Sequence, residues 1–149
     1  MIDIVSSEKR SRMMAGIKGK NTRPELAIRS RLHRLGFRFR IHDNRLPGKP
    51  DIVLKKYHAV IFVHGCFWHR HGCHLFKWPK TRPEFWEKKI NSNAENDQKV
   101  LHSLSVRGWR VCIVWECAIK GSRKKPIEDV ADTISEWLAG GEYLLEISG

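Results

Sequence analysis

Apolar positions recur at helical spacing in three stretches of the chain, and these predict three helices. They span residues 22–36, 83–106 and 126–138. In each stretch, apolar residues three and four positions apart would place one apolar face against a core and leave the other face polar. Thr22 is a favourable N-cap, and Gly36 suits the position after the last turn, so the first helix has clear ends.

Two other patterns predict strands. Aromatic or aliphatic residues alternate with basic ones over residues 37–42, which is typical of a half-buried strand. Denser apolar runs predict three strands more, over 51–54, 58–64 and 109–117. The resulting order, α, β, β, β, α, β, α, predicts an α/β domain with a mixed central sheet flanked by helices.

The length of 149 residues suits a single domain, and no repeat or long linker divides the chain. We expect a basic N-terminal arm over 1–20, a core over 21–138 and a tail over 139–149. The arm reads as a short helix from Ser6 with only a thin apolar stripe, so we expect it to become fully ordered on a partner.

Charge points to a polyanionic partner. The chain holds 28 Lys and Arg against 16 Asp and Glu, a net charge of +12. Residues 1–56 carry 15 of these basic residues and 5 acidic ones, whereas residues 126–149 carry 6 acidic residues and no Lys or Arg. Nucleic acid is the commonest such partner, and a basic protein without one is the alternative.

No apolar run approaches the ~18 residues that a membrane span requires, and the N-terminal segment has no apolar stretch typical of a secretory signal. We therefore expect a cytoplasmic protein without a membrane partner. In that reducing compartment, the four cysteines are expected to be metal ligands or buried thiols rather than disulfides.

The segment HGCFWHRHGCH, residues 64–74, concentrates residue types that bind metals. Cys66, His71 and Cys73 offer two thiolates and an imidazole on one loop, a donor set that suits tetrahedral zinc. Cys117 would end the 109–117 strand, where it can reach that loop. A zinc ion with these four ligands would be closed to substrate and therefore structural.

Other readings of these residues remain open. His69 and His74 are alternatives to His71, and the cysteines of the group are buried free thiols in the absence of a metal. Cys112 lies in the middle of an apolar strand, so we expect it in the core.

Asp51 opens a predicted strand in strongly basic surroundings, and His64 ends the next strand. If the two strands pair antiparallel, these residues meet at one edge of the sheet, within reach of His69. A carboxylate for a magnesium ion and a histidine as general base suit phosphodiester hydrolysis. The alternative for Asp51 is a turn or salt-bridge carboxylate.

Half of the chain's 14 aromatic residues fall within residues 62–86. Phe67 and Trp68 lie between the expected metal ligands, where rigid rings on a basic surface can wedge into a base stack. A local hydrophobic cluster is the alternative, and we favour it for Phe62 and Phe76.

Four segments resemble the very short patch repair endonuclease family. They are PGKPD (47–51), VIFVHGCFWHRHGCH (60–74), TRPEFWEKKI (81–90) and GWRVCIVWEC (108–117). The resemblance implies a restriction-endonuclease-like fold and a magnesium-dependent nick in double-stranded DNA. The nick would fall 5′ of the thymine in a T:G mismatch left by deamination of 5-methylcytosine, so the implied role is DNA repair.

The resemblance also implies roles for residues in the active site. Asp51 matches the magnesium ligand, and Val63 matches a residue that binds the ion through its backbone carbonyl. His64 and His69 match the active-site histidines, with His69 as the general base, and Glu25 matches an acid near the metal's water shell. Threonine is expected where this chain has Val63, which leaves the effect of that substitution open.

Further matches concern zinc and DNA. The structural zinc ligands match Cys66, His71, Cys73 and Cys117. DNA-contacting residues match Phe67, Trp68, Trp86 and, on the basic arm, Met14, whereas Asn93 is a candidate for a base edge on chemical grounds alone.

Two other functions remain open: a zinc-stabilised DNA-binding module without catalysis, and a restriction endonuclease that cuts unmismatched DNA. Asp51 favours catalysis, because a carboxylate beside phosphate weakens simple binding. An aromatic wedge on a monomer favours a nick. Assistance from mismatch-repair proteins is a question that the sequence leaves open.

Overall fold

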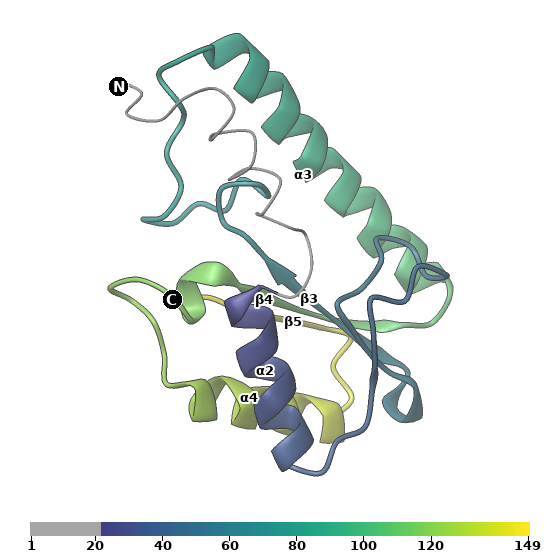
Figure 1. The fold of residues 1–149 in the computed structure, drawn as a ribbon. Helices are drawn as coiled ribbons and strands as arrows, with labels where there is room; N and C mark the ends of the chain where they lie inside the picture. The colour runs from purple at the N-terminus through teal and green to yellow at the C-terminus, as the bar shows by residue number, and fades with distance from the viewer. Residues whose placement is uncertain (1–21) are drawn as a thin grey trace.

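The computed structural model describes residues 22–149, so the expected arm and Met14 lie outside the described part (Figure 1). The main elements in chain order are α2 (Arg23–Arg34), β1 (Arg40–Ile41), β2 (Ile52–Leu54), β3 (Ala59–His64), α3 (Pro83–Val106), β4 (Arg110–Trp115), α4 (Ile127–Ala139) and β5 (Leu144–Ile147). Two short 3-10 helices follow β2 and β4, namely η1 (Lys55–Tyr57) and η2 (Glu116–Ala118).

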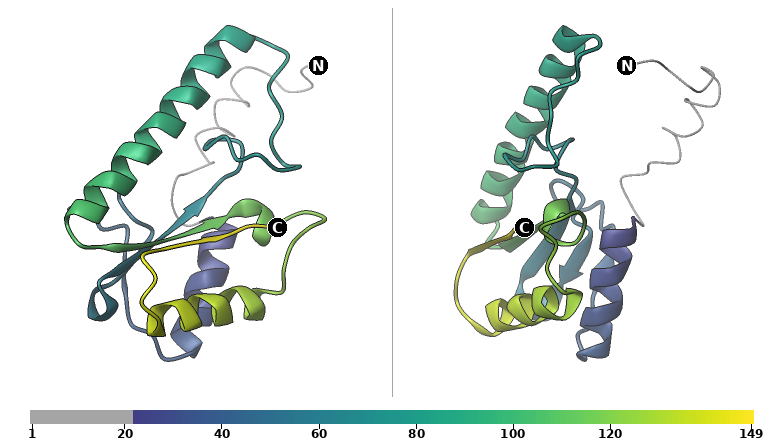
Figure 2. Two further views of the ribbon diagram at one scale, coloured as in Figure 1. Left: turned by 180° about the vertical axis from the view of Figure 1, so that it is seen from behind. Right: turned by 90° about the vertical axis from the view of Figure 1, so that its left-hand side faces the viewer.

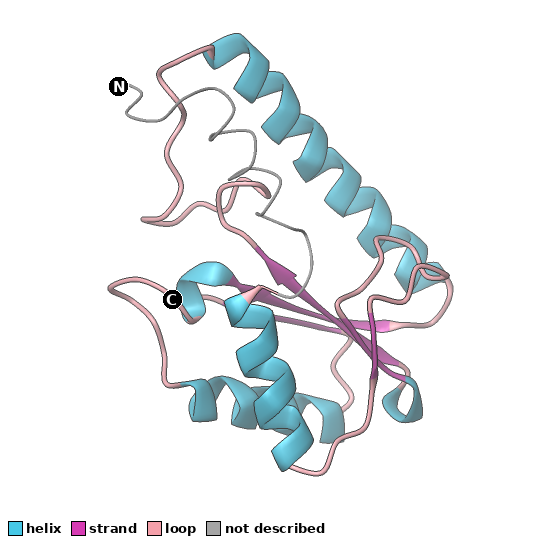
Figure 3. Ribbon diagram, viewed as in Figure 1, coloured by secondary structure: helices cyan, strands magenta, loops and turns pink. Residues whose placement is uncertain are grey.

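The strands form one five-stranded mixed sheet in the order β1-β2-β3-β4-β5 (Figure 3). β1 pairs antiparallel with β2, and β2 with β3. The second pairing follows from the tight connection through η1 that joins β2 to β3. β3, β4 and β5 are parallel, because α3 and then α4 carry the chain back to the same end of the sheet. The predicted α/β class with a mixed sheet is confirmed.

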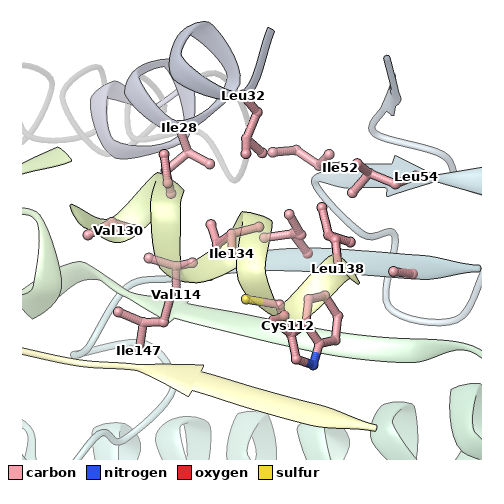
Figure 4. Close-up of a cluster of buried hydrophobic side chains, with 14 of the residues drawn as sticks. Ile28, Leu32, Ile52, Leu54, Cys112, Val114, Val130, Ile134, Leu138 and Ile147 are labelled. Atoms are coloured by element: carbon pink, nitrogen blue, oxygen red, sulfur yellow. The ribbon is translucent and has the colours of Figure 1, made fainter. Parts of the chain in front are cut away.

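The helices cover both faces of the sheet (Figures 1 and 2). On one face, α2 and α4 pack through Ile28, Leu32 and Ile134 against strand residues that include Ile52 and Val114 (Figure 4). On the other face, α3 packs through Leu104 against a second buried cluster. None of the described helices is long and apolar enough to span a membrane.

Two stretches differ from the sequence prediction. The strand expected over 37–42 is reduced to Arg40–Ile41, because Phe37 still bonds back to the end of α2 and the backbone turns at His42, which has a φ of +49° although its amide still bonds the Asp51 carbonyl. The stretch 139–149, expected as a tail outside the core, contributes β5 at the edge of the sheet. β5 pairs with the edge of β4 that faces away from β3. The elements predicted from the sequence included no strand for that edge.

Candidate active site and metal centre

The start of β2 meets the end of β3 at one edge of the sheet. Ile52 pairs with Ile61 in an antiparallel register, so the residue before β2 lies beside the last residues of β3. The Val63 N–H donates a 2.6 Å hydrogen bond to Asp51 Oδ2. The antiparallel arrangement on which the sequence argument for Asp51 depended is therefore present.

Glu25 and His42 complete an acidic group around Asp51. Each of the three offers a ligand atom, and these atoms lie within 4.8 Å of one another. Glu25 sits in the first turn of α2, where Thr22 caps the helix by accepting the Glu25 N–H at 3.4 Å. Burial raises the pKa of the Asp51 carboxyl; the Val63 N–H opposes this shift and the nearby Glu25 adds to it. Two buried carboxyl groups in contact create a place that favours a cation.

The distance between His42 and Glu25 bears on how these two side chains interact. His42 Nε2 lies 2.6 Å from Glu25 Oε2, a hydrogen-bond distance. Adjacent ligands of an octahedral ion with 2.1 Å bonds are about 3 Å apart, so this contact is shorter than joint ligation would give. His42 is therefore placed to orient Glu25 through this hydrogen bond.

Two stacked imidazoles lie on the other side of the β3 end. The rings of His64 and His69 are 3.8 Å apart and inclined by 5°. His69 Nδ1 lies 2.6 Å from Asp97 Oδ2, and since a carboxylate only accepts, the ring nitrogen donates. Burial lowers the pKa of His64 to about 3, with a smaller contribution from His69, so this ring is neutral at ordinary pH where it stacks on His69.

Cys66, His71, Cys73 and Cys117 converge as the sequence pattern predicted. Their ligand atoms all lie within 4.8 Å of one another. Both Cys66 Sγ and Cys117 Sγ lie 3.5 Å from His71 Nδ1. A tetrahedral zinc with bonds of 2.3 Å to sulfur and 2.0–2.1 Å to nitrogen separates such atoms by about 3.6 Å, so the donor set and its spacing fit zinc.

Backbone groups hold the cluster together. The amides of Cys117 and Gly149 donate to Cys66 Sγ at 3.4 Å and to Cys117 Sγ at 3.3 Å. The ring of His71 stacks on Trp115 at 4.1 Å. Cys112 lies in the other buried cluster, between β4 and α4, in agreement with its expected place in the core.

An aromatic group borders the metal-binding loop. Phe67 contacts Trp68 and Trp86 with ring centroids 5.3 and 5.4 Å apart, and Trp68 lies 5.8 Å from Trp86. All three rings are half-buried. Phe62 is buried in the core, as expected, and Phe76 extends the group by stacking on Phe67.

A cleft of about 550 Å³ connects these parts. It is lined by Thr22, Pro24, Glu25, Val63, His64, Gly65, Phe67, Trp68, His69, Lys89, Asn93 and Glu116. Asn93, expected to contact DNA, donates its amide to the Trp68 carbonyl at 3.0 Å and so holds the aromatic turn against α3. Carboxylates, imidazoles and aromatic rings therefore line one space of a size that admits part of a nucleic acid.

The side chain of Val63 packs against the cluster formed by α2 and α4, so a β-branched apolar residue suits this position structurally. Its backbone amide donates the hydrogen bond to Asp51.

Three site residues were missed from the sequence. Asp97 had a usable signal, since it lies one helical turn after Asn93 on the same face of α3. His42 had none, because the alternating pattern placed it on a strand that ends one residue earlier. Glu116, next to Cys117, accepts the Cys66 N–H at 3.3 Å and ties the metal-binding loop to η2, a contact between segments that local pattern does not connect.

Comparison with known proteins gives a consistent set of relatives. The sequence model of the family DNA mismatch endonuclease Vsr matches residues 2–75. The DNA mismatch endonuclease Vsr of Escherichia coli (strain K12) is 45% identical over 140 residues, which cover 94% of this chain and 90% of that protein. The type II nicking enzyme V.XorIIP of Xanthomonas oryzae pv. oryzae is 45% identical over 134 residues, 89% of this chain and 98% of that protein.

Proposed function

The chain belongs to the Vsr DNA mismatch endonuclease family, nucleases that hydrolyse DNA phosphodiester bonds, and we propose that it nicks duplex DNA 5′ of the thymine in a T:G mismatch. The observation that carries this proposal is that one cleft is lined by His69, by Phe67 and Trp68 of the aromatic group, and by Glu25. The Glu25 carboxylate lies within 4.8 Å of the Asp51 carboxylate. A carboxylate, a base and a wedge are the three functions that a mismatch nuclease requires. We also propose that the mixed sheet is a restriction-endonuclease-like core, with the acid at the start of β2.

We propose Asp51 and the Val63 carbonyl as the magnesium ligands, with Glu25 held by His42 next to the metal's waters. The buried, oxygen-rich donor set fits a hard cation. Magnesium bound there would supply charge to stabilise the pentacovalent phosphate. Asp51 is anchored by the Val63 amide, so its second oxygen keeps a defined direction.

His69 is proposed as the general base. Its Nδ1 donates to Asp97, which leaves Nε2 as the nitrogen that accepts the proton of the attacking water. His64 supports the ring from one side through the stacking contact. The Asp97 carboxylate stabilises the imidazolium that this transfer creates, in the manner of a triad carboxylate.

Phe67, Trp68 and Trp86 are proposed to insert into the base stack at the mismatch, and the Cys66, His71, Cys73 and Cys117 cluster to hold structural zinc behind them. A T:G pair costs less to unstack than a Watson–Crick pair, so insertion favours the mismatch. We further propose that the chain acts as a monomer and cuts one strand.

The direct test is incubation of the protein with end-labelled duplexes that are matched or carry one T:G pair, with and without magnesium. We expect one nick, in the thymine strand of the mismatched duplex, only with magnesium. Binding without cleavage would support a zinc-stabilised DNA-binding module, and cleavage of both strands of the matched duplex would support a restriction endonuclease.

A further inference from the structure

A basic loop joins η2 to α4 at the edge of the sheet that carries the candidate active site. It contains four cations within six residues, Lys120, Arg123, Lys124 and Lys125, and all four are exposed. Among the ion pairs of residues 22–149, one involves this loop, between Lys120 and Glu116 at 3.8 Å. Three cations of the loop therefore meet solvent without an acidic partner in the described part of the chain.

The backbone of this 120–125 loop is held in place. The amides of Lys120 and Lys125 donate to the carbonyls of Glu116 at 2.8 Å and Ala118 at 2.7 Å. Gly121 has a φ of +91°, and a Cβ there would come within 3.1 Å of His74 Nε2. Because Gly121 has no side chain, the loop packs closely on the segment that contains His74. The backbone that carries the four cations is therefore held in place.

The position of the loop relates it to the cleft. It follows η2, the short helix that contains the metal-cluster residue Cys117, and its Gly121 lies against His74 of the segment that holds Cys66, His71 and Cys73. The opposite end of the sheet carries η1, with Lys55 and Lys56. The aromatic group, through Phe67 and Trp68, and the basic loop, through Gly121, therefore both adjoin the segment that contributes three members of the metal cluster.

We propose that the 120–125 loop binds backbone phosphates of the duplex that flanks the cleavage site, an inference that rests on the proposed function. Lys and Arg side chains on a fixed loop suit phosphate oxygens of any sequence. The loop therefore adds affinity and sets the orientation of the duplex without selecting the mismatch. Contact with this loop would extend the DNA-binding surface beyond the cleft. The loop lies outside residues 1–56, the part of the chain in which the sequence showed the excess of basic residues.

The test compares two variants with the same change in charge. Arg123→Gln, Lys124→Gln and Lys125→Gln are combined in one protein. The control combines Lys55→Gln, Lys56→Gln and Arg107→Gln at the far end of the sheet, where Arg107 contacts His58 through its carbonyl. Binding to matched and T:G duplexes is measured from low to high salt, without magnesium.

For the loop variant, we expect the slope of log K against log salt to become shallower by roughly 0.9 per lost phosphate contact, about two to three in total. The loss is expected to be the same for both duplexes, and the control slope to stay near the native value. Equal slopes for the two variants, or a loss confined to the T:G duplex, would overturn the inference.

Zinc content and circular dichroism check that the loop variant is folded; if either changes, Lys124→Gln with Lys125→Gln is used, with an expected change in slope of about two. The nicking assay on the native chain is independent of this comparison. A native chain that binds DNA with the expected loop effect but never nicks a T:G duplex would contradict the proposed function alone.

Discussion

His69 and Asp97, 28 positions apart in the chain, are joined by a 2.6 Å hydrogen bond between Nδ1 and Oδ2. The bond links the metal-binding loop to the middle of α3. It fixes both the orientation of the imidazole and the nitrogen that carries its proton, and the two are what a general base requires.

Asp97→Asn tests this relationship. The amide keeps the size of the side chain but no longer stabilises an imidazolium, so we expect the single-turnover nicking rate to fall roughly 10²- to 10⁴-fold with little change in DNA affinity. Glu95→Gln, an exposed position two residues earlier on the same helix, is the control. A native rate for Asp97→Asn would show that the pair is only structural.

His42 provides a second prediction, on the metal side of the cleft. Its 2.6 Å bond to Glu25 orients a carboxylate next to the proposed magnesium. We expect His42→Ala to raise the magnesium concentration for half-maximal nicking by about 10- to 100-fold, and His42→Gln to recover most of the loss because its amide can still donate.

The control for this experiment is His33→Ala, an exposed histidine on α2. If His42→Gln were as defective as His42→Ala, or if only the maximal rate changed, the orienting role would be wrong.

The cysteine cluster predicts one zinc ion per chain. Cys117→Ser is expected to lower both the zinc content and the free energy of unfolding, because a ligand that closes the site is lost. Cys112→Ala, five residues earlier and in the core, should keep its zinc. Metal analysis and denaturant titration decide, and full zinc in Cys117→Ser with loss in Cys112→Ala would reverse the assignment.

The aromatic group predicts a difference between duplexes. Trp68→Ala removes a ring that contacts Phe67 and Trp86, and we expect a greater loss of affinity for T:G than for matched DNA, on the order of 1–3 kcal/mol. Trp78→Ala, an exposed ring that contacts Phe76, is the matched control. Equal losses on both duplexes would mean that Trp68 only packs.

The local sequence pattern was sufficient to predict a site residue where the end of an expected strand lies near the rest of the site. Cys117 was assigned to the cluster from its place at a strand end, and the four ligand atoms converge. Leu144–Ile147 gave no strand signal, because the stretch is short and pairs with β4 only through tertiary contact. His42 and Asp97 each depend on a contact with a distant segment, 17 and 28 positions away, which periodicity does not report.

The most direct measurement is the nicking rate of Asp51→Asn on a T:G duplex in magnesium. The substitution keeps the size of the side chain and removes the charge that we propose holds the ion. The Val63 amide can donate to the side-chain oxygen of asparagine as it does to that of Asp51. We predict no detectable nicking, with DNA binding retained or tightened because a negative charge near phosphate is gone. Nicking by Asp51→Asn at the native rate would contradict the account, because the catalytic metal would then lie elsewhere.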